Sequence, residues 1–380
     1  MKLHHLIPLL SLALAGKKAD TIINYFNPEP YDIEPKLNEE SITLGYVTPW
    51  HGYGYDIAKW NNKKFNIISP VWIQVTPSFA FTGLHDVDDS WIDEVRSNRN
   101  TKIFPRVLFQ NWSVQDVIDQ LPELANHLND LAEKHKFNGF VIEMSWQNLM
   151  YQATAGINKV LEKIEEFGEN SEYELIMVLP PMQARQNSEF DKFGVPSVYY
   201  HFFTPQFFDQ IEKYFIAFQI MTYDYNGVRD GLGMPNAPYN WVRDSINGIT
   251  GGSRQRAKKV LLGLNFYGRF YSEVKQDAII GSEFLKRIKE TKSPMKLSWD
   301  KNFQEYKLFI EDGRVTYFYP SVKSIQKRLE LADQLGCGVA IWELGQGMEN
   351  FMEAFRDRDF PTNHDEKNDD FDEDRYLDEL

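Results

Sequence analysis

The chain has 380 residues, of which 42% are hydrophobic and 14% aromatic, so it is long enough to bury one large core or two. Its formal net charge is −14, which argues against a nucleic-acid partner, because such a partner needs a basic face. A single cysteine, Cys337, excludes an internal disulfide, and its place at the start of an apolar run predicts a buried, inert thiol.

Residues 1–15 have the pattern of a secretory signal peptide. A basic and polar start is followed by an apolar run over residues 6–15, and the alanines that close this run match the small-x-small cleavage rule. An apolar run of this length is too short to cross a bilayer, so we expect no membrane insertion. Residues 16–40 contain Pro and Asn without helical periodicity, and we predict a leader segment there, before a domain at residues 41–360.

Short apolar runs alternate with stretches of helical periodicity from about residue 41 to residue 356. The runs are rich in Val, Ile and Phe, which is typical of buried parallel strands. Eight such units in one chain predict an α/β fold, a (β/α)8 TIM barrel. The runs span residues 42–48, 67–75, 102–108, 139–145, 175–181, 217–225, 260–267 and 337–344.

The gap between the seventh run and the last helical stretch is too long for one crossover helix. Residues 269–320 fill it, and three short segments within them, 295–299, 306–311 and 314–319, have the composition of strands near an Asp-Gly turn. We therefore expect a small α+β insertion between the seventh strand and the last helix.

Barrel enzymes place their sites at the carboxyl-terminal ends of the strands, and several ends are polar or aromatic here. A tryptophan on a barrel strand is more often a core residue than a ligand platform, and an aspartate at a strand end often holds a backbone amide or an arginine. The order of the motifs therefore matters more than any one of them. They are Trp50 after the first run, Asn138-Gly-Phe-Val141-Ile-Glu143-Met-Ser145-Trp146 at the fourth, Met221-Thr-Tyr223-Asp224-Tyr225 at the sixth, Tyr267-Gly-Arg269 at the seventh and Trp342-Glu343 at the eighth.

In this order and spacing, the motifs resemble those of glycoside hydrolase family 18, the chitinases, over residues 41–356. The family has Asp-Gly-x-Asp-x-Asp-x-Glu at the fourth strand. Aligned with that pattern, Asn138 and Val141 take the places of the first two Asp residues, Glu143 that of the third, and Ser145 that of the terminal Glu. The terminal Glu is the family's general acid, and a serine hydroxyl cannot donate a proton in that role at neutral pH.

Glu143 does not replace the missing acid. It faces the same way as Ser145 but lies two residues, roughly 6.6 Å, deeper along the strand. A group that protonates the glycosidic oxygen must lie within about 3 Å of it. The resemblance therefore implies a chitinase-like protein that binds sugar without cutting it. The motifs are also similar to those of one non-catalytic branch of the family.

The resemblance implies a carbohydrate-binding site for chito-oligosaccharides or other N-acylglucosamine glycans, without cofactor or metal. Glu143 and Tyr223 would hold an acetamide group, and Trp342 would be a stacking platform. Two alternatives stay open: an active glycosidase that uses another carboxylate, such as Asp224 or Glu343, and a luminal scaffold that binds another protein. The predicted carbohydrate-binding residues are Trp342, Tyr223, Asp224, Glu143, Trp50, Trp146 and Tyr267.

Two further signals concern processing and location. Asn111 begins a glycosylation sequon in a loop-like setting. Residues 361–380 are predicted to be a disordered acidic tail, because residues 365–380 contain nine acidic residues and only two basic ones. The tail ends in Asp-Glu-Leu, similar to an endoplasmic-reticulum retention signal, although Leu377 stands in the place of Lys or His. We expect a secretory-pathway protein, in the endoplasmic reticulum lumen, secreted or lysosomal, with a sorting or retrieval receptor as partner.

Overall fold

The structure is a computed structural model and describes most of the chain between residue 18 and residue 357. The predicted signal peptide (1–15) and acidic tail (361–380) lie outside the described residues, as does the Asp-Gly pair at 312–313. The described ranges are 18–36, 41–98, 100–146, 157–184, 199–200, 203–225, 233–311 and 314–357.

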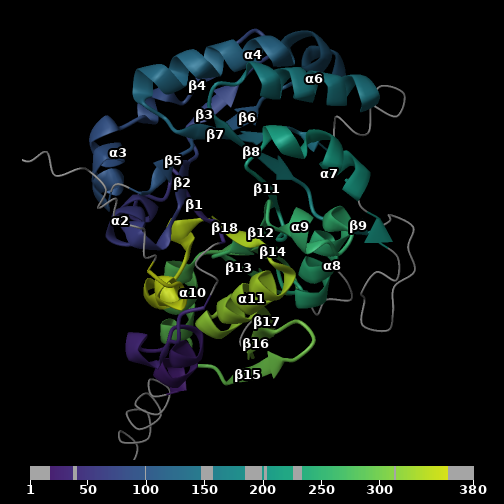
Figure 1. Cartoon of the computed structure of the whole chain (residues 1–380). Helices are drawn as coiled ribbons and strands as arrows, with labels where there is room; N and C mark the ends of the chain where they lie inside the picture. Colours follow the sequence, from purple (N-terminus) through teal and green to yellow (C-terminus); the bar gives the residue numbers. More distant parts are fainter. Residues whose placement is uncertain are drawn as a thin grey trace, which may run out of the picture.

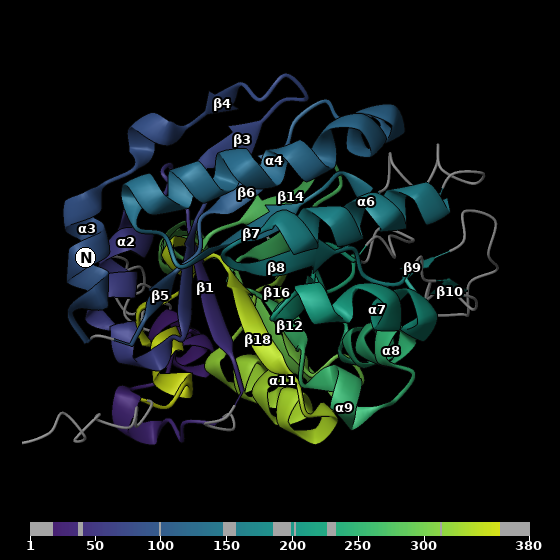
Figure 2. The ribbon, with the colours of Figure 1, turned by 45° about the horizontal axis from the view of Figure 1, so that its top comes forward.

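Eight parallel strands close into a barrel, which confirms the predicted fold class (Figures 1 and 2). The strands are β1 (Thr43–Val47), β2 (Ile67–Pro70) with β3 (Ile73–Val75), β5 (Lys102–Ile103) with β6 (Arg106–Phe109), β7 (Gly139–Glu143), β8 (Glu174–Leu179), β11 (Ala217–Ile220), β12 (Val260–Asn265) and β18 (Gly338–Trp342). The second and third strands are each interrupted for two residues. Because β2 pairs with β5 and β3 pairs with β6, the interrupted strands still close the ring.

Helices cover the outside of the barrel, and Figure 1 shows α4 and α6 side by side along one edge. The helices are α2 (Tyr53–Trp60), α3 (Asp89–Val95), α4 (Val114–His135), α6 (Ile157–Asn170), α7 (Pro205–Ile211), α8 (Tyr239–Thr250), α9 (Arg254–Ala257) and α11 (Val322–Leu335). The longest, α4, begins at a capping box in which Ser113 and Asp116 satisfy each other's backbone N–H groups. It ends at Lys136, which is left-handed with φ 54°.

Two apolar layers hold the barrel together. One lies between the strands and the helices, and the other fills the barrel interior. Interior side chains come from alternate positions of the strands, as expected of a filled barrel. Packing therefore closes the interior, and polar side chains gather at the carboxyl-terminal ends. The interior layer comprises Leu44, Tyr46, Ile67, Phe104, Val141, Ile176, Val178, Ala217, Leu261 and Ala340.

The expected α+β insertion follows β12. It is a five-stranded antiparallel sheet in the order β14-β13-β17-β16-β15, with one helix, and it precedes α11 as predicted. Figure 1 shows this sheet on the side of the molecule away from α4 and α6. The insertion consists of β13 (Gly268–Tyr271), β14 (Gln276–Ile279), α10 (Gly281–Glu290), β15 (Met295–Asp300), β16 (Glu305–Ile310) and β17 (Val315–Phe318).

The leader segment contains a helix, so the prediction that it lacks helical periodicity is wrong. Residues 18–26 form a helix. Its buried side chains are Ala19, Ile22 and Phe26, which are spaced three and four residues apart and share one helical face. The ring centroid of Phe26 lies 5.0 Å from that of Phe284 in α10, so this helix packs against the insertion.

Among the described helices, none is both long and apolar enough to cross a membrane. Three pairs of residues add short strands beside the barrel and its loops: β4 (Phe81–Thr82), which lies antiparallel to β3, and β9 (Gln183–Ala184) with β10 (Tyr199–Tyr200).

Candidate functional site

A buried ion pair lies inside the carboxyl-terminal end of the barrel. Arg106 of β6 donates from Nε to Glu143 Oε2 of β7 at 2.6 Å. The two side chains are 11% and 19% exposed, so water screens the pair only weakly. Burial alone would lower the pKa of Arg106, but the adjacent Glu143 carboxylate outweighs it and raises that pKa. The predicted acetamide-binding residue Glu143 is therefore already held by an arginine.

Four more side chains complete this interior cluster, which we define as Tyr46, Arg106, Glu143, Gln219, Tyr223 and Trp342. The Tyr46 hydroxyl donates to Gln219 Oε1 at 2.9 Å, and Gln219 Nε2 donates to the Tyr223 hydroxyl oxygen at 3.2 Å. Burial raises the pKa of both phenols, so they stay neutral donors and acceptors.

Trp342 ends β18 and lies half-buried beside the ion pair. The guanidinium carbon of Arg106 is 5.4 Å from its ring centroid, a cation–π distance, and the Tyr46 ring is 5.2 Å away on centroids. The predicted platform is thus in direct contact with the cluster that contains Glu143 and Tyr223. Part of its side chain remains exposed to solvent.

The degenerate motif of the fourth strand contains one fully buried position and several half-buried ones. Val141 is completely buried among the interior apolar side chains. Asn138, at the opposite end of β7, accepts with Oδ1 from the backbone N–H of Ile103 and from Arg96, so it fixes the start of the strand. Strand β7 ends at Glu143, and Ser145 follows it in a half-buried position. Among the described side chains of β7 and its continuation to Trp146, no carboxylate stands beyond Glu143.

A second cluster, the rim cluster, consists of Asp224, Asn236, Tyr267 and Arg269. Asp224 Oδ1 accepts from the Tyr267 hydroxyl at 2.6 Å and from Arg269 Nη2 at 2.8 Å. The backbone of Asp224 is left-handed, with φ 58°, and its N–H donates to Asn236 Oδ1. Strand β11 ends at Ile220, so residues 221–225 are an irregular segment rather than the strand that the apolar run predicted. The side chain of Asp224 is 58% exposed.

Glu343, the other carboxylate considered for catalysis, points away from solvent. Its side chain is 0% exposed, Oε1 lies 2.7 Å from His51 Nδ1, and Oε2 accepts from the backbone N–H of Gly345. Burial raises the pKa of this carboxyl to about 7. Desolvation likewise lowers the pKa of His51. Glu343 therefore ties β18 to the loop after β1, and no face of it is open to a ligand.

The other two predicted tryptophans have opposite environments. Trp50 is 62% exposed after β1, and Tyr53 and Trp60 of α2 are exposed near it in sequence. Trp146 is only 2% exposed, donates from its indole to the carbonyl of Val178 and packs against Phe203. Trp146 offers no ring face to a ligand, and we leave it out of the proposed site.

Two remaining predictions concern surface chemistry. Asn111 is exposed and left-handed, with φ 60°, in the turn before α4, a setting that leaves its side chain open to modification. Ser113 of the same sequon caps α4. Cys337 is fully buried, and burial raises the pKa of its thiol to about 12, so the thiol is inert.

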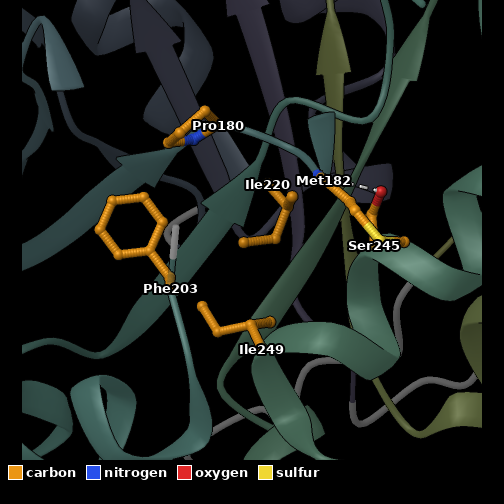
Figure 3. A pocket seen from close by; sticks show the side chains of 6 residues that line it. All are labelled: Pro180, Met182, Phe203, Ile220, Ser245 and Ile249. Carbon is orange, nitrogen blue, oxygen red and sulfur yellow. Dashed lines mark hydrogen bonds between the residues drawn. The ribbon is translucent and has the colours of Figure 1, made fainter. Parts of the chain in front are cut away.

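Two small cavities do not serve as sugar sites. One, of about 10 Å³, lies between the barrel and α8 and is lined by Pro180, Met182, Phe203, Ile220, Ser245 and Ile249 (Figure 3). The other has the same volume and lies between β12, β16 and α11, beside the buried pair of Glu305 and Arg328. Each has room for about one water molecule. Among the described residues, no group of three His, Cys, Asp or Glu side chains is placed to hold a metal ion.

Residues 43–347, most of the chain, match the family described as glycosyl hydrolases family 18, so the chain belongs to that family. Solved structures with the same fold include a chitinase from Chromobacterium violaceum, 18% identical with a TM-score of 0.62 over 83% of this chain and 97% of that one. A plant class V chitinase mutant from Cycas revoluta, in complex with (GlcNAc)3, is 14% identical with a TM-score of 0.63 over 82% and 98%. The spore cortex-lytic enzyme SleL of Bacillus cereus is 13% identical with a TM-score of 0.64 over 83% and 74%.

Sequence reasoning missed two of the residues that shape the site, Arg106 and Gln219. Both carry polar side chains inside predicted apolar runs, and a polar residue there was a usable signal. The sequence predicted Glu143, Tyr223 and Trp342, and the structure brings these three together with Arg106. Asp224 and Tyr267 lie together in the separate rim cluster.

Proposed function

We propose that this protein is a non-catalytic, chitinase-like lectin that binds N-acetylglucosamine oligosaccharides, including chitin oligomers and bacterial glycans with N-acylated glucosamine. The observation that carries the proposal is the fourth strand. A serine stands at the position of the family's general acid, and the nearest carboxylate, Glu143, is paired with Arg106. Glu143 Oε2 accepts from Arg106, and this carboxyl group lies two residues before the position of the acid, so it does not stand in the acid's place.

The residues that remain at the strand ends suit binding. Trp342 supplies an indole next to polar groups, and sugar C–H faces stack on such rings. Glu143 Oε1 and the Tyr223 hydroxyl offer an acceptor and a donor, which is the pair that an acetamide group requires. Trp50 presents an exposed ring after β1 and is a second platform. The (GlcNAc)3 complex of the Cycas revoluta chitinase supports this ligand class.

Within the family, we propose membership of the non-catalytic branch typified by chitinase domain-containing protein 1, also called stabilin-interacting chitinase-like protein. The support is a set of short motifs that resemble that branch. They are Tyr46-Val-Thr-Pro-Trp50, Thr82-Gly-Leu-His-Asp-Val87, Met221-Thr-Tyr-Asp-Tyr225, Leu262-Gly-Leu-Asn-Phe-Tyr-Gly268 and Ile341-Trp-Glu-Leu-Gly-Gln-Gly347.

Two measurements test the lectin proposal. Hydrolysis of a fluorogenic chito-oligosaccharide, at neutral and acidic pH, is expected to stay at the level of a heat-killed control. Turnover that is abolished by Glu143→Gln or Asp224→Asn would establish a glycosidase instead. Calorimetric titration with chitotetraose is expected to show saturable binding, and its absence in a folded protein would favour the protein-binding scaffold.

We also propose that the protein resides in the secretory pathway, with partial retention in the endoplasmic reticulum and leakage to the outside or to lysosomes. The supports are the signal-peptide pattern of residues 1–15 and the Asp-Glu-Leu terminus. Deletion of residues 377–380 is expected to raise secretion. Equal secretion of full-length and truncated chains would show that no retrieval receptor recognises the terminus.

A further inference from the structure

We infer that Arg106 is a ligand-binding residue and that it selects an oligosaccharide in which a carboxylate-bearing sugar adjoins N-acetylglucosamine. This inference rests on the proposed lectin function and narrows its ligand class. The carboxylate would lie against the free edge of the Arg106 guanidinium, beside the ring of Trp342.

The register of the barrel places Arg106 where the family's motif has lost an acid. In the parallel ladder between β6 and β7, Arg106 lies opposite Val141, and Leu108 lies opposite Glu143. From the level of Val141, the side chain of Arg106 extends to the level of Glu143 and to the ring of Trp342. Val141 thus removes one carboxylate from this face of the barrel, and Arg106 beside it adds a guanidinium that pairs with the remaining carboxylate, Glu143.

The hydrogen-bond inventory leaves donors in excess. Only Nε of Arg106 is used, and among the described residues its Nη1 and Nη2 atoms have no hydrogen-bond partner. The Tyr223 hydroxyl accepts from Gln219, which leaves its own hydrogen for another acceptor. Glu143 Oε1 and the hydroxyl oxygen of Tyr46 are the acceptor atoms of this group that no hydrogen bond between described residues uses. Arg106 Nη1 and Nη2 together carry more N–H groups than these two oxygen atoms.

A carboxylate satisfies this arrangement better than a neutral sugar does. A guanidinium edge with two parallel N–H donors matches the two oxygens of a carboxylate, and such charge-assisted bonds are stronger than bonds to hydroxyl groups. Arg106 would then bridge two carboxylates, with Nε on Glu143 and the Nη edge on the ligand. Because the side chain is only 11% exposed, water competes weakly for those donors. Glu143 Oε1 would still accept the N–H of a neighbouring acetamide.

The test compares three tetrasaccharides by calorimetric titration. Chitotetraose is neutral. In the second oligomer, N-acetylglucosamine alternates with N-acetylmuramic acid. In the third, which comes from hyaluronan, it alternates with glucuronic acid. The two acidic oligomers therefore carry the carboxylate at different places on the sugar. A version of each acidic oligomer with its carboxylates converted to amides separates charge from shape. We expect at least one acidic oligomer to bind roughly ten- to a hundredfold more tightly than chitotetraose and than its own amide, which is the scale of one charge-assisted hydrogen-bonded contact.

The variants assign that preference to one residue. Arg106→Gln is expected to remove it, and the double variant Arg106→Gln with Glu143→Gln keeps the test open if a lone buried Glu143 prevents folding. Arg269→Gln is the matched control, because that arginine lies in the rim cluster and its Nη2 is already held by Asp224. It should leave the preference intact.

The outcomes separate the two proposals. Equal affinity of the wild-type protein for all oligomers would overturn this inference and leave the lectin function standing. Binding of none of them would overturn both. A preference that survives the double variant, or that disappears with Arg269→Gln, would move the acidic-sugar contact away from Arg106 and so overturn the assignment.

Discussion

The interior cluster and the rim cluster each contain one arginine–carboxylate pair, and they differ chiefly in burial. Arg106 and Glu143 are 11% and 19% exposed, whereas Arg269 and Asp224 are 23% and 58% exposed. The rim pair keeps the family's motif residues and holds Asp224 in a left-handed turn. The interior pair includes an arginine that the family's fourth-strand motif does not specify.

A guanidinium and a carboxylate thus have different roles in a buried pair and in an exposed pair. In the interior, each charge depends on its partner, because little water can replace it. At the rim, solvent screens both charges and the pair mainly fixes the orientation of Asp224. In the interior pair the carboxylate of Glu143 is already held by Arg106, whereas Asp224 at the rim keeps more than half of its side chain exposed.

The largest effect is expected when the interior pair is broken on one side. Arg106→Met leaves Glu143 without its partner and should lower the free energy of unfolding by about 3 kcal/mol, measured by urea denaturation. Replacement of both partners, Arg106→Met with Glu143→Leu, should recover most of the loss, because no lone charge remains. A single variant as stable as the wild type would show that water reaches Glu143 freely.

Glu343 extends the comparison to a buried carboxylate whose neighbour is a histidine. Its pKa in the folded protein is about 7, above the ordinary value of 4.5, so the folded state holds a proton that the unfolded state has lost between those values. The free energy of unfolding contributed by this group therefore falls as pH rises from 4.5 to 7. At about 1.36 kcal/mol per pKa unit, this decline amounts to about 3 kcal/mol at most, and Glu343→Gln should abolish it because the amide does not titrate.

The measurement is urea denaturation of the wild type and Glu343→Gln at intervals from pH 4.5 to 8. The variant should gain stability relative to the wild type as pH rises. His51→Gln is a matched control, since it removes the neighbour and keeps the carboxyl. Parallel stability curves for the wild type and Glu343→Gln would contradict the raised pKa.

Binding gives the next effect in size. Trp342→Ala should weaken the binding of chitotetraose by about 1–3 kcal/mol, because it removes the ring on which a sugar face is proposed to stack. Trp50→Ala should weaken the same ligand by a smaller amount, because its ring stands alone and 62% exposed. Trp146→Ala is the control for packing: it should destabilise the fold, not affinity in the protein that stays folded. Unchanged affinity in Trp342→Ala would make Trp342 a core residue.

The sequence predicted the barrel well because burial periodicity is a local signal repeated eight times. All eight apolar runs contain barrel strands, and the insertion lies where the overlong gap predicted it. The pairing of Glu143 with Arg106 could not be predicted, because 37 residues separate them and only the register of β6 and β7 brings them together. The helix at residues 18–26 is indicated by the spacing of Ala19, Ile22 and Phe26, but this helix is short and the prolines that follow it obscure the periodicity of the segment.

The smallest effect is expected at the rim. Arg269→Gln removes one partner of Asp224 but leaves the Tyr267 hydroxyl and the Asn236 contact in place. Because Asp224 is 58% exposed, water replaces the lost donor, and the free energy of unfolding should fall by only about 0.2–1 kcal/mol. The difference should shrink as salt is raised, since exposed charges are screened. A loss as large as that of Arg106→Met, and insensitive to salt, would mean that the rim pair is as dependent on its partner as the interior one, and burial would no longer explain the contrast between them.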